Sequence, residues 1–155
     1  MDFAVVGLIL LLVILVVAGF LVKKFVIEPA KASTTYRISE RFGRDEIVRQ
    51  QQFSRLIGLE STGLPDAPVL GTLVVSADRL YFAPTKGDDP TVDVPLADVI
   101  AVDLTTSHLG LSTGMPLLRV RFRTDGGEDA AAFHLPYTDE WHLAVTNLTK
   151  DLRSQ

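Results

Sequence analysis

The sequence predicts one transmembrane helix followed by a mostly β domain of the α+β class, closed by a C-terminal amphipathic helix. Residues 3–22 are twenty consecutive residues without a charge. From residue 58 onward, short apolar runs alternate with Gly, Pro, Asp and Ser, which is typical of successive antiparallel strands and turns. Apolar residues then recur at helical spacing from Trp141 to Leu152.

The N-terminal apolar segment has the length of a membrane span. A helix of twenty residues is about 30 Å long, which matches the hydrocarbon core of a bilayer. A secretory signal peptide would have a basic start, a shorter apolar core and a small-residue cleavage site. Here the start carries Asp2, and the small-residue triplet Ala30-Lys31-Ala32 lies well beyond the apolar run. We therefore expect an uncleaved anchor.

Basic residues follow the apolar segment, and no basic side chain precedes it. They are Lys23, Lys24, Lys31, Arg37, Arg41 and Arg44. Because positive residues near a span stay on the cytosolic side, we expect a single-pass protein of the plasma (inner) membrane. Its N-terminus would lie outside and its domain in the cytosol, with Lys23 and Lys24 flanking the membrane.

Composition limits the chemistry that the chain can perform. The 155 residues include no cysteine, which excludes disulfides, thiolate nucleophiles and Cys-ligated zinc. The net charge of −4 divides into +4 over residues 23–55 and −7 over residues 56–155. The basic part lies next to the bilayer, as electrostatics favours, and the acidic domain is a poor partner for nucleic acid. We expect no cofactor.

Residues 23–57 are expected to form a basic juxtamembrane linker that is partly helical. Pro29 and the small residues after it predict a break in the helix. Apolar residues from Ile38 to Ile57 are spaced by three to five, which favours two short helical pieces or a helix followed by a first strand. The folded domain would then occupy residues 58–155.

Several strands can be placed within that domain. Residues 69–76 and 79–83 predict a hairpin about Ala77-Asp78, and residues 86–90 predict the next turn. Residues 91–94 and 99–105 predict two further strands. Residues 107–114, which contain two glycines, are expected to form a loop.

Residues 117–135 predict a hairpin that turns at Gly126-Gly127. With this turn, Arg123 would oppose Ala130, Arg121 would oppose Ala132 and Arg119 would oppose His134. One face would then be apolar core, and the other would carry a row of arginines.

The last segment predicts an amphipathic helix. Thr138 is a candidate N-cap, and Asp139 and Glu140 lie in the first turn. The apolar face, led by Trp141, should cover an open end of the strand assembly.

The order of elements resembles that of pleckstrin-homology-like (PH-like) and GRAM-type domains. The likeness depends on Gly71–Val75 followed by Arg79–Phe82, on Val94-Pro95-Leu96 leading to Val99-Ile100, and on the helix with Trp141. Two more stretches, Gly58–Ser61 and Ser107–Gly110, are similar to stretches of uncharacterised bacterial PH-like proteins. The resemblance implies a roll or barrel of about seven antiparallel strands capped by the C-terminal helix. It also implies a binding module rather than an enzyme.

The candidate binding face consists of Arg119, Arg121 and Arg123, with His134 at its end. Guanidinium groups pair well with phosphate or carboxylate, so this face could bind an anionic lipid or an acidic peptide. The alternative is a solvated strand face whose arginines pair with nearby acids. We expect no metal site, because His108, His134 and His142 lack the spacing of metal-ligating pairs. No G-x-S-x-G turn nominates a nucleophilic serine.

These observations favour a membrane-anchored PH-like binding or scaffold module that acts at the cytosolic membrane surface. Its partner would be a protein or anionic lipid headgroups, and the oligomeric state stays open. The alternatives are a membrane-anchored enzyme, such as a hydrolase, and a self-assembling structural subunit.

Overall fold

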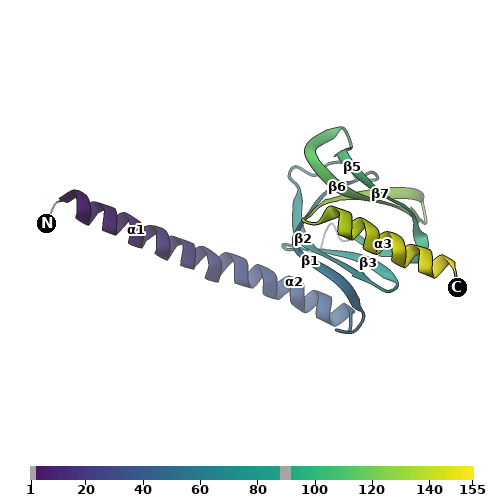
Figure 1. The fold of residues 1–155 in the computed structure, drawn as a ribbon, viewed down its shortest axis with the longest axis horizontal. Coiled ribbons are helices and arrows are strands. Elements are labelled where there is room, and N and C mark those ends of the chain that lie inside the picture. Colours follow the sequence, from purple (N-terminus) through teal and green to yellow (C-terminus); the bar gives the residue numbers. More distant parts are fainter. Residues whose placement is uncertain (1–2, 88–91) are drawn as a thin grey trace.

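The computed structural model describes residues 3–87 and 92–155, which form a long helical rod and a rolled β-sheet crossed by a C-terminal helix (Figure 1). The rod consists of α1 (Phe3–Val22), a π-helical turn (Lys23–Ile27) and α2 (Glu28–Arg41). The strands are β1 (Ile47–Leu59), β2 (Val69–Ser76), β3 (Arg79–Pro84), β4 (Val92–Pro95), β5 (Val99–His108), β6 (Leu111–Thr124) and β7 (Gly127–His134). A short 3-10 turn (Leu96–Asp98) precedes β5, and α3 (Thr138–Arg153) ends the fold.

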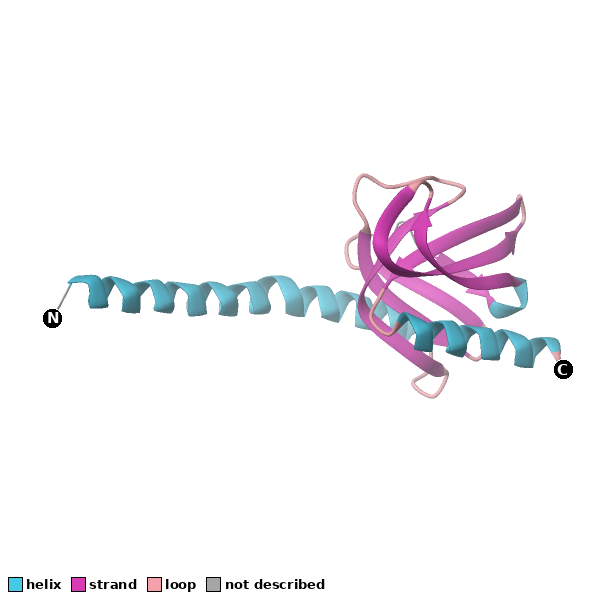
Figure 2. Cartoon of the chain, turned by 45° about the horizontal axis from the view of Figure 1, so that its top comes forward, coloured by secondary structure: helices cyan, strands magenta, loops and turns pink. Residues whose placement is uncertain are grey.

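The apolar N-terminal segment is helical over the expected residues. Among the described residues, this is the one helix that is long and apolar enough to cross a membrane. Its described side chains are exposed rather than packed on the domain. Figures 1 and 2 show it extending away from the domain. Both the sequence and the structure are therefore compatible with a membrane span.

The expected break at Pro29 is wrong. The helix continues through the π-helical turn into α2, in which Pro29 is the second residue. The π-helical turn ends at Ile27, two residues before Pro29, so the regular ladder of backbone hydrogen bonds is already altered just before the proline, which has no N–H to donate. The rod therefore passes from α1 to α2 without a linker (Figure 1).

The strands form one antiparallel sheet in the order β4-β3-β2-β1-β7-β6-β5, which rolls up on itself (Figure 2). Strand β1 connects the two halves because it pairs with β2 on one side and β7 on the other. It is irregular at Phe53, which has a φ of +58°, and the register with β2 shifts between Gln51 and Ser54. Such an irregularity bends a strand, and here it lets β1 serve both halves.

Residues 47–57 form most of β1, so of the two arrangements expected for residues 38–57 the structure shows the second, a helix followed by a first strand. The sheet therefore begins before residue 58, where we expected the domain to start. Of the polar residues 49–52, Arg49 makes contacts with α3. The Arg49 guanidinium lies 5.4 Å from the centre of the Trp141 ring and is 2.6 Å from the Glu140 carboxylate of α3.

The hairpin of β2 and β3 about Ala77-Asp78 is confirmed, as are strands at the positions of β4 and β5. Residues 88–91, which include most of the expected turn at 86–90, lie outside the described residues. The expected loop at residues 107–114 is instead a tight hairpin in which His108 pairs with Leu111. Leu109 and Gly110 at its tip both have positive φ, so strand pairing continues almost to the turn.

The hairpin of β6 and β7 has the expected faces but a register that differs by two residues. Arg121 pairs with Ala130 and Arg119 pairs with Ala132. Gly127 takes the positive φ, +129°, and the two residues between the strands are Asp125 and Gly126. Because side chains alternate along a strand, a shift of two residues changes the pairs and keeps each side chain on its face.

Helix α3 covers the open side of the roll, as the sequence predicts (Figure 1). Trp141 and Val145 are buried in the same core as Phe82 and Phe133, whose ring centres lie 5.7 Å apart. Thr138 is not the N-cap, because the helix begins at this residue and Tyr137 takes the N-cap position. The Thr138 hydroxyl instead donates a hydrogen bond to the carbonyl of Leu135.

Helix α2 packs on the outside of β2 and β3. Ile38 and Phe42 are buried against Val74 and Tyr81, and the Phe42 and Tyr81 rings meet edge to face at 5.5 Å. Two arginines of α2 add polar contacts. Arg37 donates hydrogen bonds to the carbonyls of Pro84 and Gly87, and Arg41 donates to the carboxylate of Asp93. The rod is therefore docked on the domain and is not merely tethered to it.

Candidate functional site

The arginine face lies on the outer side of β6, and the structure pairs two of its three arginines. Arg119 Nη2 is 3.1 Å from Asp103 Oδ2 on the adjacent β5. Arg121 Nη2 is 3.6 Å from Glu128 Oε2 on β7. Exposed ion pairs of this kind contribute about 0 to 1 kcal/mol, so they can be exchanged for a ligand's carboxylate or phosphate.

Arg123 is the most available of the three. It is exposed, and within the described residues no ion pair or hydrogen bond involves its side chain. It lies next to the β6–β7 turn, which Figures 1 and 2 place at the end of the domain remote from α1. The end of the arginine face that carries Arg123 therefore points away from α1.

His134 does not oppose Arg119 as expected. The shifted register places Ala132 across from Arg119, and His134 pairs with Arg55 of β1 instead. By alternation along β7, His134 keeps the outer face of Ala132. It therefore lies beside β1, at the border of the arginine face rather than within it.

Lys23 and Lys24 come directly after α1, in the π-helical turn. Both side chains are exposed, and Lys24 Nζ lies 6.0 Å from the centre of the Phe25 ring. This is the position expected of residues that flank a span at the headgroups.

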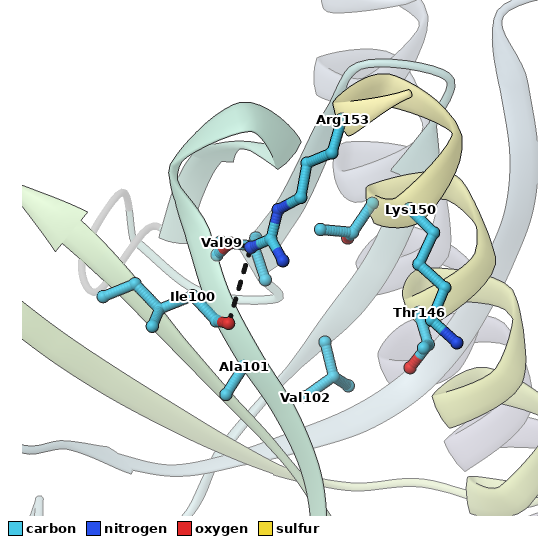
Figure 3. A pocket seen from close by; sticks show the side chains of 8 residues that line it. Val99, Ile100, Ala101, Val102, Thr146, Lys150 and Arg153 are labelled. Atoms are coloured by element: carbon cyan, nitrogen blue, oxygen red, sulfur yellow. Dashed lines mark hydrogen bonds between the residues drawn. The ribbon is translucent and has the colours of Figure 1, made fainter. Parts of the chain in front are cut away.

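A groove between the edge strand β5 and helix α3 was not found from the sequence (Figure 3). It has a volume of about 230 Å³ and is lined by Val99–Val102 together with Thr146, Thr149, Lys150 and Arg153. The signal was present as the spacing of these four polar residues on the C-terminal helix, which places them along one stripe.

Side chains of α3 close the exposed edge of β5. Arg153 Nη2 donates hydrogen bonds to the carbonyls of Val99 and Ile100, and His142 Nε2 lies 3.0 Å from the carbonyl oxygen of Val102. An unpaired strand edge otherwise invites another strand to add to it. Because these carbonyls already have partners, the groove is protected against strand addition.

A buried contact brings together residues 58–61 and residues 107–110. His108, expected in a loop, is buried at the end of β5, with its Nε2 3.1 Å from the carbonyl oxygen of Gly58. Glycine is required at position 58, since a Cβ there would lie 2.9 Å from the carbonyl oxygen of Gly63 and 3.2 Å from Leu109 Cδ1. Asp129 adds to this contact by accepting hydrogen bonds from the backbone N–H and the hydroxyl of Ser61.

Burial lowers the pKa of His108 below its ordinary value of 6.5, with a smaller contribution from Arg119. The hydrogen bond to Gly58 and the acids Glu60 and Asp129 oppose this shift without cancelling it. Neutral His108 therefore donates from Nε2 to the Gly58 carbonyl, and the unfolded chain binds a proton at this site more readily than the folded chain does.

This shift predicts acid-sensitive stability. The free energy of unfolding should be highest above about pH 6.5 and fall as the pH drops toward the lowered pKa of the folded protein. A His108→Gln variant, which keeps a donor near Gly58 but does not titrate, should lose less stability than the wild type between about pH 7.5 and pH 5. Urea unfolding in detergent micelles at each pH measures this, and His134→Gln controls for removal of an imidazole. Equal slopes for wild type and His108→Gln would refute the assignment.

The described residues contain no group of three or more His, Cys, Asp or Glu side chains that could hold a metal ion. His108 and His142 each lie within hydrogen-bonding distance of a backbone carbonyl. Both therefore have structural roles in the described fold.

Comparison with known proteins shows the fold and no more. No model of a known protein family matches the chain, and no curated protein matches it. The chain is similar to the Vps36 N-terminal PH domain, with a TM-score of 0.51 and 13% identity, over 71% of this chain and 83% of that one. It is also similar to the C-terminal domain of an unknown protein from Leishmania infantum, with a TM-score of 0.50 and 13% identity, over 79% of this chain and 97% of that one. The predicted PH-like, mostly β fold is confirmed.

Proposed function

We propose that this chain is a single-pass, membrane-anchored binding module whose PH-like domain holds a protein partner at the cytosolic membrane surface. Helix α1 would cross the bilayer with its N-terminus outside, and Lys23 and Lys24 would flank it on the cytosolic side. The docked rod supports this proposal, since it would carry the domain at a defined orientation to the membrane.

The availability of Arg123 is the observation that carries the choice of ligand. Arg119 and Arg121 already face acids, whereas Arg123 is exposed at the end of the arginine face that points away from α1. Headgroups of the bilayer that α1 crosses would lie on the opposite side. An acidic segment of a partner protein therefore suits this face better than anionic lipid does.

The proposal assigns the domain no catalytic role. The similarity to the Vps36 PH domain supports a binding function, and Arg119, Arg121, Arg123 and His134 form no arrangement of nucleophile and base in the described fold. We further propose, on the resemblance of Gly71–Val75 and Arg79–Phe82, that the domain is of the bacterial GRAM type. These stretches form the β2–β3 hairpin, as that resemblance requires.

Photo-crosslinking in intact membranes tests the proposal. A photoreactive residue at Glu128, which is exposed and pairs with Arg123 across the β6–β7 hairpin, should capture a partner from the cytosolic side. Arg123→Glu should lower the yield on the order of tenfold, the effect of losing about 1.4 kcal/mol in one charge-assisted contact. Arg44→Glu is the matched control, because Arg44 is also exposed but precedes β1.

Three results would contradict this function. Equal crosslinking yields for Arg123→Glu and Arg44→Glu would mean that the arginine face does not bind the partner. Capture of a second copy alone would favour the self-assembling subunit. Loss of binding to anionic vesicles in Arg123→Glu, with no captured protein, would favour headgroups.

A further inference from the structure

The β5–β6 hairpin ends in an apolar tip that has no charged side chain. Residues 104–118 contain no Asp, Glu, Lys or Arg. Leu109, Leu111 and Met115 are 37%, 40% and 53% exposed, and Leu64 of the β1–β2 connection is 45% exposed. Leu64 and Leu109 are neighbours, because the Cβ position of Gly58 lies 3.5 Å from Leu64 Cα and 3.2 Å from Leu109 Cδ1. Leu111 follows the turn directly, and Met115 lies four residues further along β6. We call these four residues together the apolar tip.

The backbone at the tip is strained. Leu109 has a φ of +51° and Gly110 a φ of +79°, the pattern of a two-residue hairpin turn whose first position usually holds Asn, Asp or Gly. A leucine at this position adopts a sparsely populated conformation and is still 37% exposed. The exposed part of this side chain is available for a contact outside the chain.

The docked rod determines which way the apolar tip faces. Helix α2 is held on β2 and β3 by Ile38, Phe42 and the bonds of Arg37. Figures 1 and 2 show the β5–β6 hairpin on the side of the domain toward α1, while the β6–β7 turn lies at the opposite end. If α1 crosses a bilayer, the apolar tip faces that bilayer.

The distance along the rod leaves a gap between the headgroups and the first buried residue of the rod, which tilt of the helix would have to close. The domain first buries a described residue of the rod at Thr34, about 18 Å beyond Val22 at a helical rise of 1.5 Å per residue. Headgroups occupy roughly 5 to 8 Å of this distance on each side of the hydrocarbon core. Transmembrane helices tilt by about 20° on average, and tilt toward the hairpin brings an element beside the rod closer to the surface.

We propose that the apolar tip, Leu64, Leu109, Leu111 and Met115, inserts into the headgroup region of the bilayer that α1 crosses. This inference rests on the membrane anchor of the proposed function. The contact is apolar rather than ionic, because the hairpin is uncharged and the adjacent β1–β2 connection carries Glu60 and Asp66. With α1 and the apolar tip both in the membrane, the domain has two points of attachment, and Arg123 is presented to the cytosol.

Single-cysteine labelling of the full chain tests this directly, since the natural sequence contains no cysteine. Leu111→Cys and Met115→Cys, labelled with an environment-sensitive fluorophore, are reconstituted in phosphatidylcholine vesicles. Nitroxide-labelled lipid should quench both labels and their emission should be blue-shifted. Asp125→Cys, exposed in the β6–β7 turn, is the matched control that should stay unquenched, and Leu12→Cys in α1 is the positive control.

The outcomes separate this inference from the proposed function. Quenching at position 12 without quenching at 111 and 115 would overturn the insertion of the apolar tip and would still support α1 as a membrane anchor. Absence of quenching at position 12 overturns the anchor and the inference together. A blue shift at 111 and 115 without lipid quenching points to a protein contact and overturns the lipid contact. Quenching at 111 and 115 that disappears in high salt would show an ionic contact and also overturn the proposal, whereas salt-independent quenching supports it.

Discussion

Replacing Phe133 by Ala is expected to lower the free energy of unfolding of the domain by about 3 to 5 kcal/mol. Phe133 is fully buried in β7, which lies between β1 and β6, and its ring packs on Phe82 of β3. The two rings join the halves of the rolled sheet. A cavity at this point cannot be filled by the movement of one strand alone, so most of the lost packing should appear as lost stability.

Trp141 reports this loss in the full chain. It is the one tryptophan of the sequence and is fully buried on the inner face of α3, so its fluorescence follows unfolding of the domain in urea with detergent present. Leu143→Ala is the control, because Leu143 lies on the same helix but is 59% exposed. Its expected effect is within about 0.5 kcal/mol. Comparable losses in both variants would mean that Phe133 does not lie in the core described.

Replacing Gly71 by Ala is expected to destabilise the domain by about 1 to 3 kcal/mol or more. A Cβ at this position would lie 2.3 Å from the carbonyl oxygen of Ala83 and 2.4 Å from Phe82 Cζ. Both distances are far below van der Waals contact, and one of the two atoms belongs to the backbone of β3. The β2–β3 hairpin must therefore shift, which would also disturb the surface on which α2 docks.

Gly43→Ala separates this clash from the general effect of removing a glycine. The Cβ of residue 43 would meet no described atom closer than 3.5 Å, and that atom belongs to the flexible side chain of Glu46. Urea unfolding followed by Trp141 fluorescence compares the two variants. If Gly71→Ala were as stable as Gly43→Ala, the close approach of β2 to β3 would not exist in solution.

The candidate site was only partly predictable. Alternation along residues 117–135 placed Arg119, Arg121 and Arg123 on one outer face, and the structure keeps them there. It did not predict that Arg119 faces Asp103, because that pair depends on how β5 joins β6. His134 was misplaced, since the turn at Gly126-Gly127 was read one residue too late.

Local patterns by themselves determined the apolar helix at residues 3–22, the β2–β3 hairpin, the faces of β6 and β7, and the buried stripe of α3. Each of these depends on periodic burial, which is written in neighbouring residues. The tertiary structure alone decided that the rod continues through Pro29 and docks on β2 and β3, that polar residues 49–52 belong to a strand, and that Gly58 meets His108. Some of these features join residues about fifty positions apart. Others run against the local sequence pattern, as at Pro29 and the polar residues 49–52. They arise because the rolled sheet must close and bury its edges, which no single stretch of sequence encodes.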